Sequence, residues 1–255
     1  MRIKIEAIPL NTVSRIPIQY NSSLQGYIYQ MFETTLPELH TNGYALGNKK
    51  FKHFCFSRIT SKGMKFENRM IKIFNPIYFT MSFFLDPMPN IVIKHLIRER
   101  ILRIGNEEFV IKNAQVSSEY FTGDEKEVEF DFQTLSPICV YKTFENEPYP
   151  VYYSPFDPEF YELLKNNLKA KYESIFSEAP EEDLDCFVVP VNVDPKRTLA
   201  KVYYKRTPIK AYSGKFHYKG SGKLAQIAFN TGFGSKNPQG FGLVNYSNCK
   251  VLNEI

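Results

Sequence analysis

The chain has no tryptophan and, among its 255 residues, only four cysteines and four histidines. The cysteines include no CxxC pair, so a reduced compartment with four buried thiols is favoured over a disulfide framework. The histidines include no HExxH or HxxxH pair, so the sequence predicts no bound metal, and no cofactor is expected. The cysteines are Cys55, Cys139, Cys186 and Cys249, and the histidines are His40, His53, His95 and His217.

Long apolar runs are also absent. No stretch approaches the roughly 18 uninterrupted apolar residues of a membrane-spanning helix. The N-terminal sequence MRIKIEAIPL turns polar without the apolar core of a signal peptide. We therefore expect no membrane contact and a cytoplasmic location. Aromatic residues, by contrast, make up 15% of the chain, with 22 Phe and 17 Tyr, enough bulky apolar surface for two compact cores.

Positive charge is concentrated toward the C-terminus. Residues 195–255 hold eleven Lys and Arg against Glu254 alone, so this quarter carries +10 and residues 1–194 carry −5 of the total of +5. Clustered cations gain free energy when they release counterions from a polyanion such as a nucleic acid. Aromatic residues interleave with these cations, a pattern typical both of base-stacking surfaces and of a strand with one solvated and one buried face. They are Tyr203, Tyr204, Tyr212, Phe216 and Tyr218.

The first half of the chain alternates strand and helix patterns. We expect strands at residues 2–9, 51–59, 76–85 and 107–118 and helices at residues 24–40 and 90–99. Asn21 and Ser22 are candidate N-caps of the first helix. Strict alternation would place Phe51, His53 and Cys55 on one face of the second strand. The order β-α-β-β-α-β is the split βαβ pattern of a ferredoxin-like domain with an antiparallel sheet.

The second half repeats this plan. We expect strands at residues 128–140, 186–193, 197–205, 209–220 and 241–252 and helices at residues 159–176 and 223–229. The sequence therefore predicts an α+β protein of two tandem ferredoxin-like domains, at residues 1–120 and 121–255, joined near residues 116–126.

A glycine-rich loop precedes the last strand. Residues 232–242 read GFGSKNPQGFG, so four of the 13 glycines fall within eleven residues. Glycine lets the main chain approach a ligand closely and aim several N–H groups at it, which makes this loop, with Lys236 at its crest, a candidate phosphate cradle. It is neither a Walker A loop nor a dinucleotide-binding fingerprint. A tight connection that packs helix on sheet is the alternative interpretation.

These segments together resemble a known family. The sequence GFGSKNPQGFG on a basic second domain is similar to the glycine-rich loop of the RAMP superfamily, and within it to CRISPR-associated endoribonucleases that process precursor guide RNA. Further segments fit that family, and the resemblance covers essentially the whole chain. They are residues 24–32, 39–59, 132–140 and 156–172.

The resemblance implies a chemistry and a set of catalytic residues. Such enzymes cut RNA without metal, the ribose 2′-hydroxyl attacking the adjacent phosphorus to leave 2′,3′-cyclic phosphate and 5′-hydroxyl ends. The reaction needs a base, an acid and a cation, and histidine suits proton transfer because its pKa is about 6.5. The family's histidine matches His40, with His53 as competitor. A helix tyrosine and a lysine often assist: Tyr29 is preferred over Tyr27, and Lys52 is preferred as the cation.

The resemblance also implies RNA contacts and leaves alternatives open. Besides the enzyme, the chain is compatible with a non-catalytic RAMP subunit that holds guide RNA in an effector complex and, less well, with a general RNA-recognition module. Whether the repeat binds as a hairpin or as a single strand, and whether two copies pair as a homodimer, stays open. The expected RNA-binding residues are Lys49, Lys50, Lys201, Lys205, Arg206, Gly232, Gly234, Lys236, Gly240 and Gly242.

Overall fold

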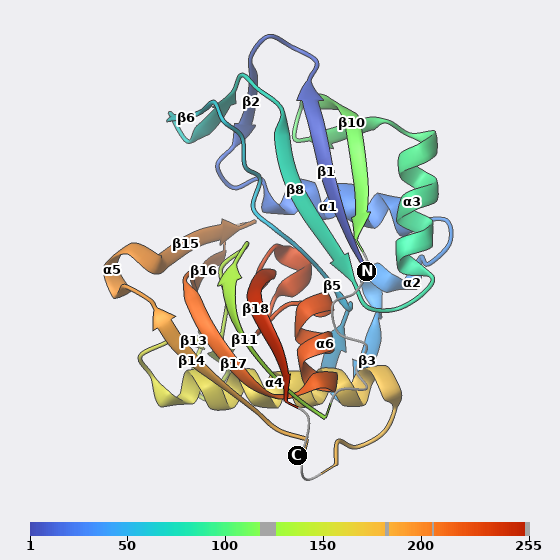
Figure 1. The fold of residues 1–255 in the computed structure, drawn as a ribbon. Coiled ribbons are helices and arrows are strands. Elements are labelled where there is room, and N and C mark those ends of the chain that lie inside the picture. The colour runs from blue at the N-terminus through green and yellow to red at the C-terminus, as the bar shows by residue number, and fades with distance from the viewer. Residues whose placement is uncertain (118–125, 182–183, 206, 253–255) are drawn as a thin grey trace.

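The computed structural model describes residues 1–117, 126–181, 184–205 and 207–252. Two α+β halves lie one above the other, the first in blue and green and the second in yellow to red (Figure 1). Each half has its own antiparallel sheet and its own hydrophobic core. The predicted boundary at residue 120 falls within residues 118–125, outside the described residues, so its position stays a prediction.

The first sheet has ferredoxin-like topology. Its order is β5-β8-β1-β10 with β9 added at one edge, and every pairing is antiparallel. Side chains of helices α1 and α3 belong to the same hydrophobic core as the buried side chains of this sheet. The strands are β1 (Arg2–Pro9), β5 (Phe54–Phe56), β8 (Ile77–Phe83), β9 (Ile101–Ile104) and β10 (Glu107–Ser117), and the helices are α1 (Asn21–Phe32) and α3 (Met88–Arg98).

The second sheet repeats this topology. Its order is β14-β17-β11-β18, so in both sheets the first strand of the unit lies between the third and the fourth. The prediction of two tandem ferredoxin-like folds is thereby confirmed. The strands are β11 (Glu127–Thr134), β14 (Cys186–Asn192), β17 (Lys215–Ser221) and β18 (Val244–Leu252), and the helices are α4 (Pro158–Phe176) and α6 (Gly222–Thr231).

Aromatic packing fills the second core. Apolar side chains at helical spacing on α4 turn Phe160, Leu164 and Leu168 onto the sheet, where all three are buried. The ring of Phe132 on β11 stacks on Phe233 at 4.5 Å between ring centroids. Because Phe233 belongs to the glycine-rich loop, this contact fixes one end of the loop to the core.

Several short elements lie outside the two main sheets. Residues 14–17 and 64–73, which the sequence did not predict as strands, form a three-stranded sheet, and the predicted strand 197–205 belongs to a separate hairpin, β15–β16. The short elements are β2 (Ser14–Pro17), β6 (Met64–Glu67), β7 (Met70–Ile73), β3 (Tyr44–Leu46), β4 (Lys49–Phe51), β12 (Tyr141–Lys142), β13 (Val151–Tyr152), β15 (Leu199–Tyr204), β16 (Thr207–Tyr212), α2 (Glu38–Thr41), α5 (Pro195–Thr198) and the 3₁₀ turn η1 (Asn237–Gln239).

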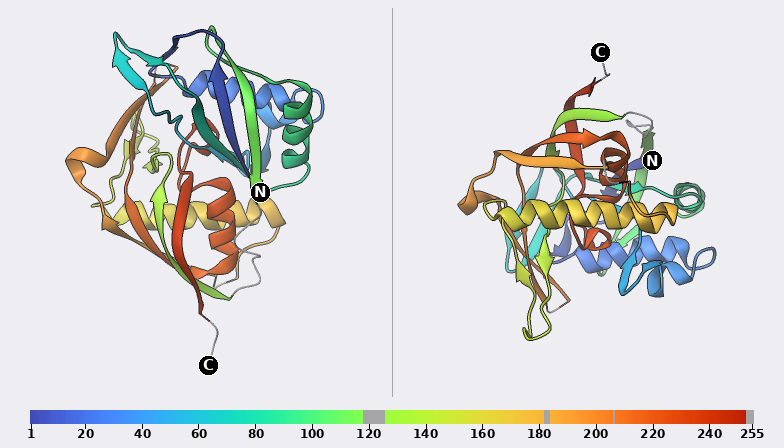
Figure 2. Two further views of the ribbon diagram at one scale, coloured as in Figure 1. Left: turned by 45° about the horizontal axis from the view of Figure 1, so that its top comes forward. Right: turned by 90° about the horizontal axis from the view of Figure 1, so that it is seen from below.

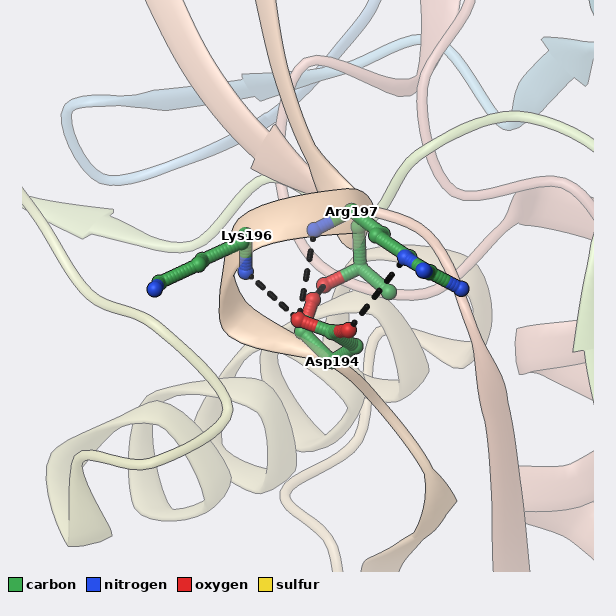
Figure 3. A network of polar contacts seen from close by, with 4 residues as sticks. Asp194, Lys196 and Arg197 are labelled. Carbon is green, nitrogen blue, oxygen red and sulfur yellow. Dashed lines mark hydrogen bonds and ion pairs between the residues drawn. The ribbon is translucent and has the colours of Figure 1, made fainter.

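A capped turn leads into the β15–β16 hairpin. Asp194 accepts hydrogen bonds from the backbone N–H groups of Lys196, at 2.8 Å, and Arg197, at 3.4 Å, and its other oxygen lies 3.7 Å from the Arg197 guanidinium (Figure 3). These bonds satisfy N–H groups that the first turn leaves without partners. The hairpin then reaches the first half (Figure 2, left). There the Tyr203 N–H donates to Gln19 at 2.9 Å.

The first helix differs from its prediction at both ends. It begins at Asn21 without a side-chain cap, so the predicted capping by Asn21 or Ser22 is wrong. The Asn21 amide instead donates to the Gln239 carbonyl at 2.7 Å in the other half of the molecule. The helix ends at Phe32, and the separate turn α2 begins at Glu38 with Pro37 as its N-cap. Because proline has no N–H, one unbroken helix through residue 37 would lack a hydrogen bond there.

Two predicted strands are interrupted. Residues 51–59 break at Lys52 and His53, where His53 has a φ of 51°, so the predicted alternation of Phe51, His53 and Cys55 on one strand face is wrong. Residues 209–220 divide at Ser213 and Gly214 into β16 and β17, which belong to different sheets. In both cases tertiary contacts override local alternation.

The two halves are joined by buried polar contacts. Arg2 of β1 donates to the carbonyls of Val244, at 2.6 Å, and Phe229, at 2.5 Å, and its guanidinium lies 3.2 Å from the centre of the Phe229 ring. The Arg58 N–H also donates to the Leu135 carbonyl at 3.0 Å. Among the described residues, no helix is both long and apolar enough to span a membrane.

Candidate active site and nucleic-acid interface

His40 and Tyr29 lie in ring contact. His40 stands on α2 with its side chain exposed, and Tyr29 projects from α1. Their ring centroids are 4.7 Å apart with planes at 84°, an edge-to-face contact. Burial raises the pKa of the Tyr29 phenol well above its usual value, with Tyr204 adding to the rise and a Gln25 hydrogen bond opposing it. Tyr29 is therefore a protonated hydrogen-bond donor at neutral pH.

Two of the predicted lysines, Lys50 and Lys52, donate hydrogen bonds to the backbone around His40. Lys52 donates to the carbonyls of Leu39, at 2.5 Å, and His40, at 2.9 Å, so its ammonium holds α2 in place and keeps one N–H for a ligand. Burial, with a smaller contribution from Lys50, lowers the pKa of Lys52. Lys50 donates to the Thr41 carbonyl at 3.3 Å. The cation preferred from the sequence is thus fixed to the backbone of the histidine.

A cavity of about 550 Å³ opens beside His40. Both halves of the molecule line it, because the β15–β16 hairpin brings Tyr204 and Lys205 against α1 and α2. The Tyr204 hydroxyl donates to the Gln25 side chain, which fixes the hairpin there. Lys205 thus lines the same cavity as His40. Tyr204 was noted in the sequence only as one of the interleaved aromatic residues.

A second, larger cavity adjoins the first. Its volume is about 780 Å³, and Gln25 and Tyr29 line both cavities. The predicted residues Lys49, Lys50, Lys52, Gly234 and Lys236 all line the second cavity. The structure therefore brings the predicted catalytic residues and the half-buried part of the glycine-rich loop to two adjoining cavities that share Gln25 and Tyr29.

The glycines of the loop pack closely against the protein's own backbone and side chains. Gly232, Gly234, Gly240 and Gly242 all have positive φ, between 68° and 88°. At Gly242 a Cβ would overlap the Phe233 carbonyl. All four glycines are buried, whereas Lys236 is only half-buried. These glycines thus permit the loop's conformation, and the side chains open to a ligand are those between them.

The segment before β12 supports the loop from one side. The Ser235 N–H donates to the Cys139 carbonyl at 2.8 Å, and the Gly242 N–H donates to the Pro137 carbonyl at 2.9 Å. The Ser136 hydroxyl accepts from the Leu243 N–H at 2.9 Å. These bonds hold residues 136–139 against the glycine-rich loop.

Lys171 of α4 supports the loop from the other side. Its side chain is 3% exposed, and its ammonium donates to the carbonyls of Gly232, at 2.6 Å, and Gly234, at 3.2 Å, and to the Asn237 side-chain oxygen, at 2.8 Å. Burial lowers the pKa of Lys171 to about 7. Sequence analysis missed this residue. The available signal was its spacing: a lysine three positions after Leu168 lies on the apolar, core-facing side of the helix.

His53 is placed as a packing residue. It is 3% exposed, its ring stacks on Phe51 at 5.8 Å between centroids, and its Nε2 lies 3.1 Å from the Ser174 hydroxyl. Burial, reinforced by Lys171, lowers the pKa of His53 to about 3, so its imidazole is neutral at physiological pH. His40, and not His53, has the exposure that a group exchanging protons with a substrate needs.

Three further predicted RNA-binding residues differ in their surroundings. Lys201 is exposed on β15 and lines neither cavity, and Arg206 lies outside the described residues. Lys236 lies over the Tyr141 ring, 4.6 Å from its centre. In the described parts of the chain no group of three His, Cys, Asp or Glu side chains could hold a metal ion.

Comparison with family models covers nearly the whole chain. Residues 15–115 match the model of the CRISPR-associated protein Cas6, N-terminal, and residues 118–246 match that of the CRISPR associated protein Cas6, C-terminal. The CRISPR-associated endoribonuclease Cas6 of Pyrococcus furiosus is 28% identical, with 100% of this chain and 93% of the relative covered. Cas6 1 of Methanocaldococcus jannaschii is 27% identical, with 100% and 98% covered.

Solved structures show the same fold. A Cas6-related protein from Pyrococcus furiosus superposes with a TM-score of 0.81 at 23% identity, covering 97% of this chain and 98% of that one. A structure described as a RAMP protein binding different RNA substrates superposes with a TM-score of 0.80 at 22% identity, covering 97% and 100%. With both halves matched by its family models, the chain belongs to the CRISPR-associated Cas6 family.

Proposed function

We propose that this protein binds CRISPR repeat RNA and cleaves the precursor guide RNA within each repeat. The proposed reaction needs no metal and leaves 2′,3′-cyclic phosphate and 5′-hydroxyl ends. Family membership and the relatives named Cas6 endoribonucleases support the substrate class. The observation that carries the proposal is the ring contact between His40 and Tyr29 beside cavities that also reach the glycine-rich loop.

His40 and Tyr29 would share the proton transfers. His40 takes the proton of the 2′-hydroxyl, and the 2′-oxygen forms a bond to phosphorus as the bond from phosphorus to the 5′-oxygen breaks. The Tyr29 phenol, which stays protonated because burial raises its pKa, gives its proton to the leaving 5′-oxygen. The His40 imidazolium then restores the Tyr29 proton, so the net transfer runs from the 2′- to the 5′-oxygen.

Cations would bind and orient the RNA. The third N–H of Lys52 and the ammonium of Lys205, which lines the cavity beside His40, would stabilise the negative charge that develops on the phosphate during the reaction. Lys49, Lys50 and Lys236 line the adjoining cavity and would hold the flanking backbone. Lys201 and Arg206 complete the proposed RNA contacts, and the buried loop glycines contribute through the loop conformation that presents Lys236.

Cleavage of end-labelled repeat RNA in EDTA tests the proposal. The unaltered protein should make one discrete cut whose product carries a cyclic phosphate. His40→Ala should lower the single-turnover rate by about 10²- to 10⁴-fold, the usual contribution of a proton-transfer group, while RNA still binds. Normal cutting by His40→Ala would refute its role. Tight retention of RNA without any cut by the unaltered protein would favour a non-catalytic subunit.

Two tyrosine variants separate catalysis from packing. Tyr29→Phe should lower the cleavage rate about 10²-fold, the usual effect of removing one donor to a reacting oxygen. Tyr27→Phe is the matched control, because Tyr27 is buried on the same helix and lines neither cavity. Equal loss of rate in both variants would assign the effect to packing of α1.

The proposal extends to later partners of the product. The cut RNA would pass to a CRISPR effector complex. While the repeat is bound, the protein would be either a monomer or a homodimer. Light scattering of the protein with and without repeat RNA distinguishes the monomer from the homodimer.

A further inference from the structure

A buried lysine without a carboxylate partner is an unusual feature of the second half. Lys171 is 3% exposed, and its three acceptors are two carbonyls and one amide oxygen, all uncharged. Within the described parts of the chain, no carboxylate pairs with it. A buried ion without a counter-charge is costly, and such costs are concentrated at functional sites.

The three bonds define the shape of the glycine-rich loop. The Gly232 and Gly234 carbonyls converge on the same ammonium, and Asn237 links that ammonium to the far side of the loop by donating to the carbonyls of Phe233 and Phe241, each at 3.0 Å. Three acceptors need three N–H donors, and only the charged form of lysine supplies them. The conformation therefore depends on the ammonium.

The residue that holds the loop also belongs to the lining of the cavity of about 780 Å³. Lys171, Gly234 and Lys236 all line that cavity. Carbonyl oxygens repel phosphate, but an ammonium bound to two of them offsets their negative partial charges and adds a positive charge in a region of low dielectric constant. An anion entering the cavity would therefore gain from this charge as well as from Lys236.

We propose that Lys171 is a positioning residue for RNA: it fixes the glycine-rich loop through three hydrogen bonds and supplies the buried positive charge that an RNA phosphate stabilises. This rests on the proposed function only in that RNA is the ligand of the loop.

Two titratable groups near Lys171 stay neutral over the working range of pH. Cys55 on β5 is fully buried, and burial raises its thiol pKa to about 12, so it stays neutral. His53, whose pKa burial lowers to about 3, also stays neutral. The cations nearby are Arg2 and the Met1 ammonium, which act on Cys55, and Lys236, which lines the same cavity as Lys171. With a pKa of about 7, Lys171 is half-charged near neutral pH, and a phosphate that favours its charged form raises that pKa.

Binding of fluorescent repeat RNA, measured by anisotropy in a His40→Ala background between pH 6.5 and 9, tests the proposal. The sign follows from linkage: the anion binds the charged form better, so affinity falls as pH rises through 7. We expect a fall of roughly tenfold, the factor that corresponds to a shift of one pKa unit on binding. Lys171→Met should bind roughly tenfold more weakly at pH 6.5 and lose this pH dependence.

Lys169→Met on the same helix is the matched control, because Lys169 is half-buried and pairs with Asp185 at 3.8 Å. It should keep the affinity and the pH profile of its parent. If Lys171→Met does not fold by circular dichroism, Lys171→Gln replaces it: the amide supplies two donors and no charge, so affinity falls and the pH dependence is lost. A folded Lys171 variant with the parent's affinity and pH profile would overturn the proposal.

A separate measurement distinguishes this failure from failure of the proposed function. Hydrogen exchange of residues 232–242 in the RNA-free protein should be faster in Lys171→Met than in Lys169→Met, with β1 unchanged. Equal hydrogen exchange of the loop in the two variants would show that Lys171 does not fix the loop, and would overturn that part of the proposal. If the parent does not bind repeat RNA at any pH, the proposed function fails, and the exchange result still decides whether Lys171 holds the loop.

Discussion

Two histidines of this chain show how burial decides chemistry at the scale of a residue. His40 stands exposed on a short helical turn, in contact with one tyrosine ring. His53, thirteen positions later, is enclosed by Phe51, Tyr44 and Ser174, and burial lowers its pKa to about 3. The first can exchange protons with a ligand, and the second stays neutral and packs.

The buried His53 should make folding stability depend on pH. Its folded-state pKa of about 3 lies below the usual 6.5, so as pH falls from about 6.5 the unfolded chain takes up a proton that the native state resists. Stability due to this group is complete above pH 6.5 and is lost toward pH 3. Between pH 7 and 5 we expect the free energy of unfolding to fall by about 2 kcal/mol from His53 alone.

Urea unfolding of His53→Gln at both pH values measures this contribution. The variant should lose about 2 kcal/mol of the pH-dependent change, because glutamine does not titrate. His40→Gln, at an exposed position, is the matched control and should keep the change. An identical pH dependence in all three proteins would show that His53 protonates in the native state as readily as in the unfolded chain.

At the scale of elements, sequence reasoning succeeded where one periodic pattern runs unbroken. The helix expected at 159–176 is α4 (Pro158–Phe176), because its apolar stripe and its flanking proline act locally. Strand 51–59 failed because burial of His53 against α4 bends the chain there. The glycine-rich loop was found from its composition, but Lys171, 61 positions before Gly232, joins it only through tertiary contacts.

The glycines of the loop should be intolerant of a side chain, unlike a helical glycine. At Gly242, with a φ of 81°, a Cβ would overlap the Phe233 carbonyl and lie 2.7 Å from the Asn237 amide nitrogen. We expect Gly242→Ala to lower the free energy of unfolding by about 3 kcal/mol or more. Gly26 of α1 has no atom within 4 Å of such a Cβ, so Gly26→Ala should raise stability by about 0.5–1 kcal/mol.

Thermal unfolding of the two alanine variants gives the comparison directly. Gly242→Ala should melt below the unaltered protein and Gly26→Ala above it. A Gly242→Ala melting temperature equal to that of the unaltered protein would mean that the loop has an alternative conformation of similar energy. That result would also remove the structural reason for four glycines in eleven residues.

At the scale of the molecule, the proposed site exists only while both halves keep their mutual orientation. His40 and Tyr29 come from the first half, whereas Lys205 and Lys236 come from the second, and the two cavities span the junction. Sequence reasoning predicted two similar domains but not their contact surface, because that surface depends on pairs such as Arg2 and Val244, 242 positions apart.

Arg2 should couple folding and activity across this junction. Arg2→Met keeps an apolar chain of similar length but removes the donors to the Val244 and Phe229 carbonyls, which stay buried, so we expect a loss of about 3 kcal/mol in the free energy of unfolding. The cleavage rate should also fall, because the site needs both halves in a fixed mutual orientation to hold RNA against His40. Arg15→Met, at an exposed position of β2, is the control and should change neither quantity. Calorimetry should resolve two transitions in Arg2→Met where the unaltered protein gives one, and a single unshifted transition would show that the halves are held together without Arg2.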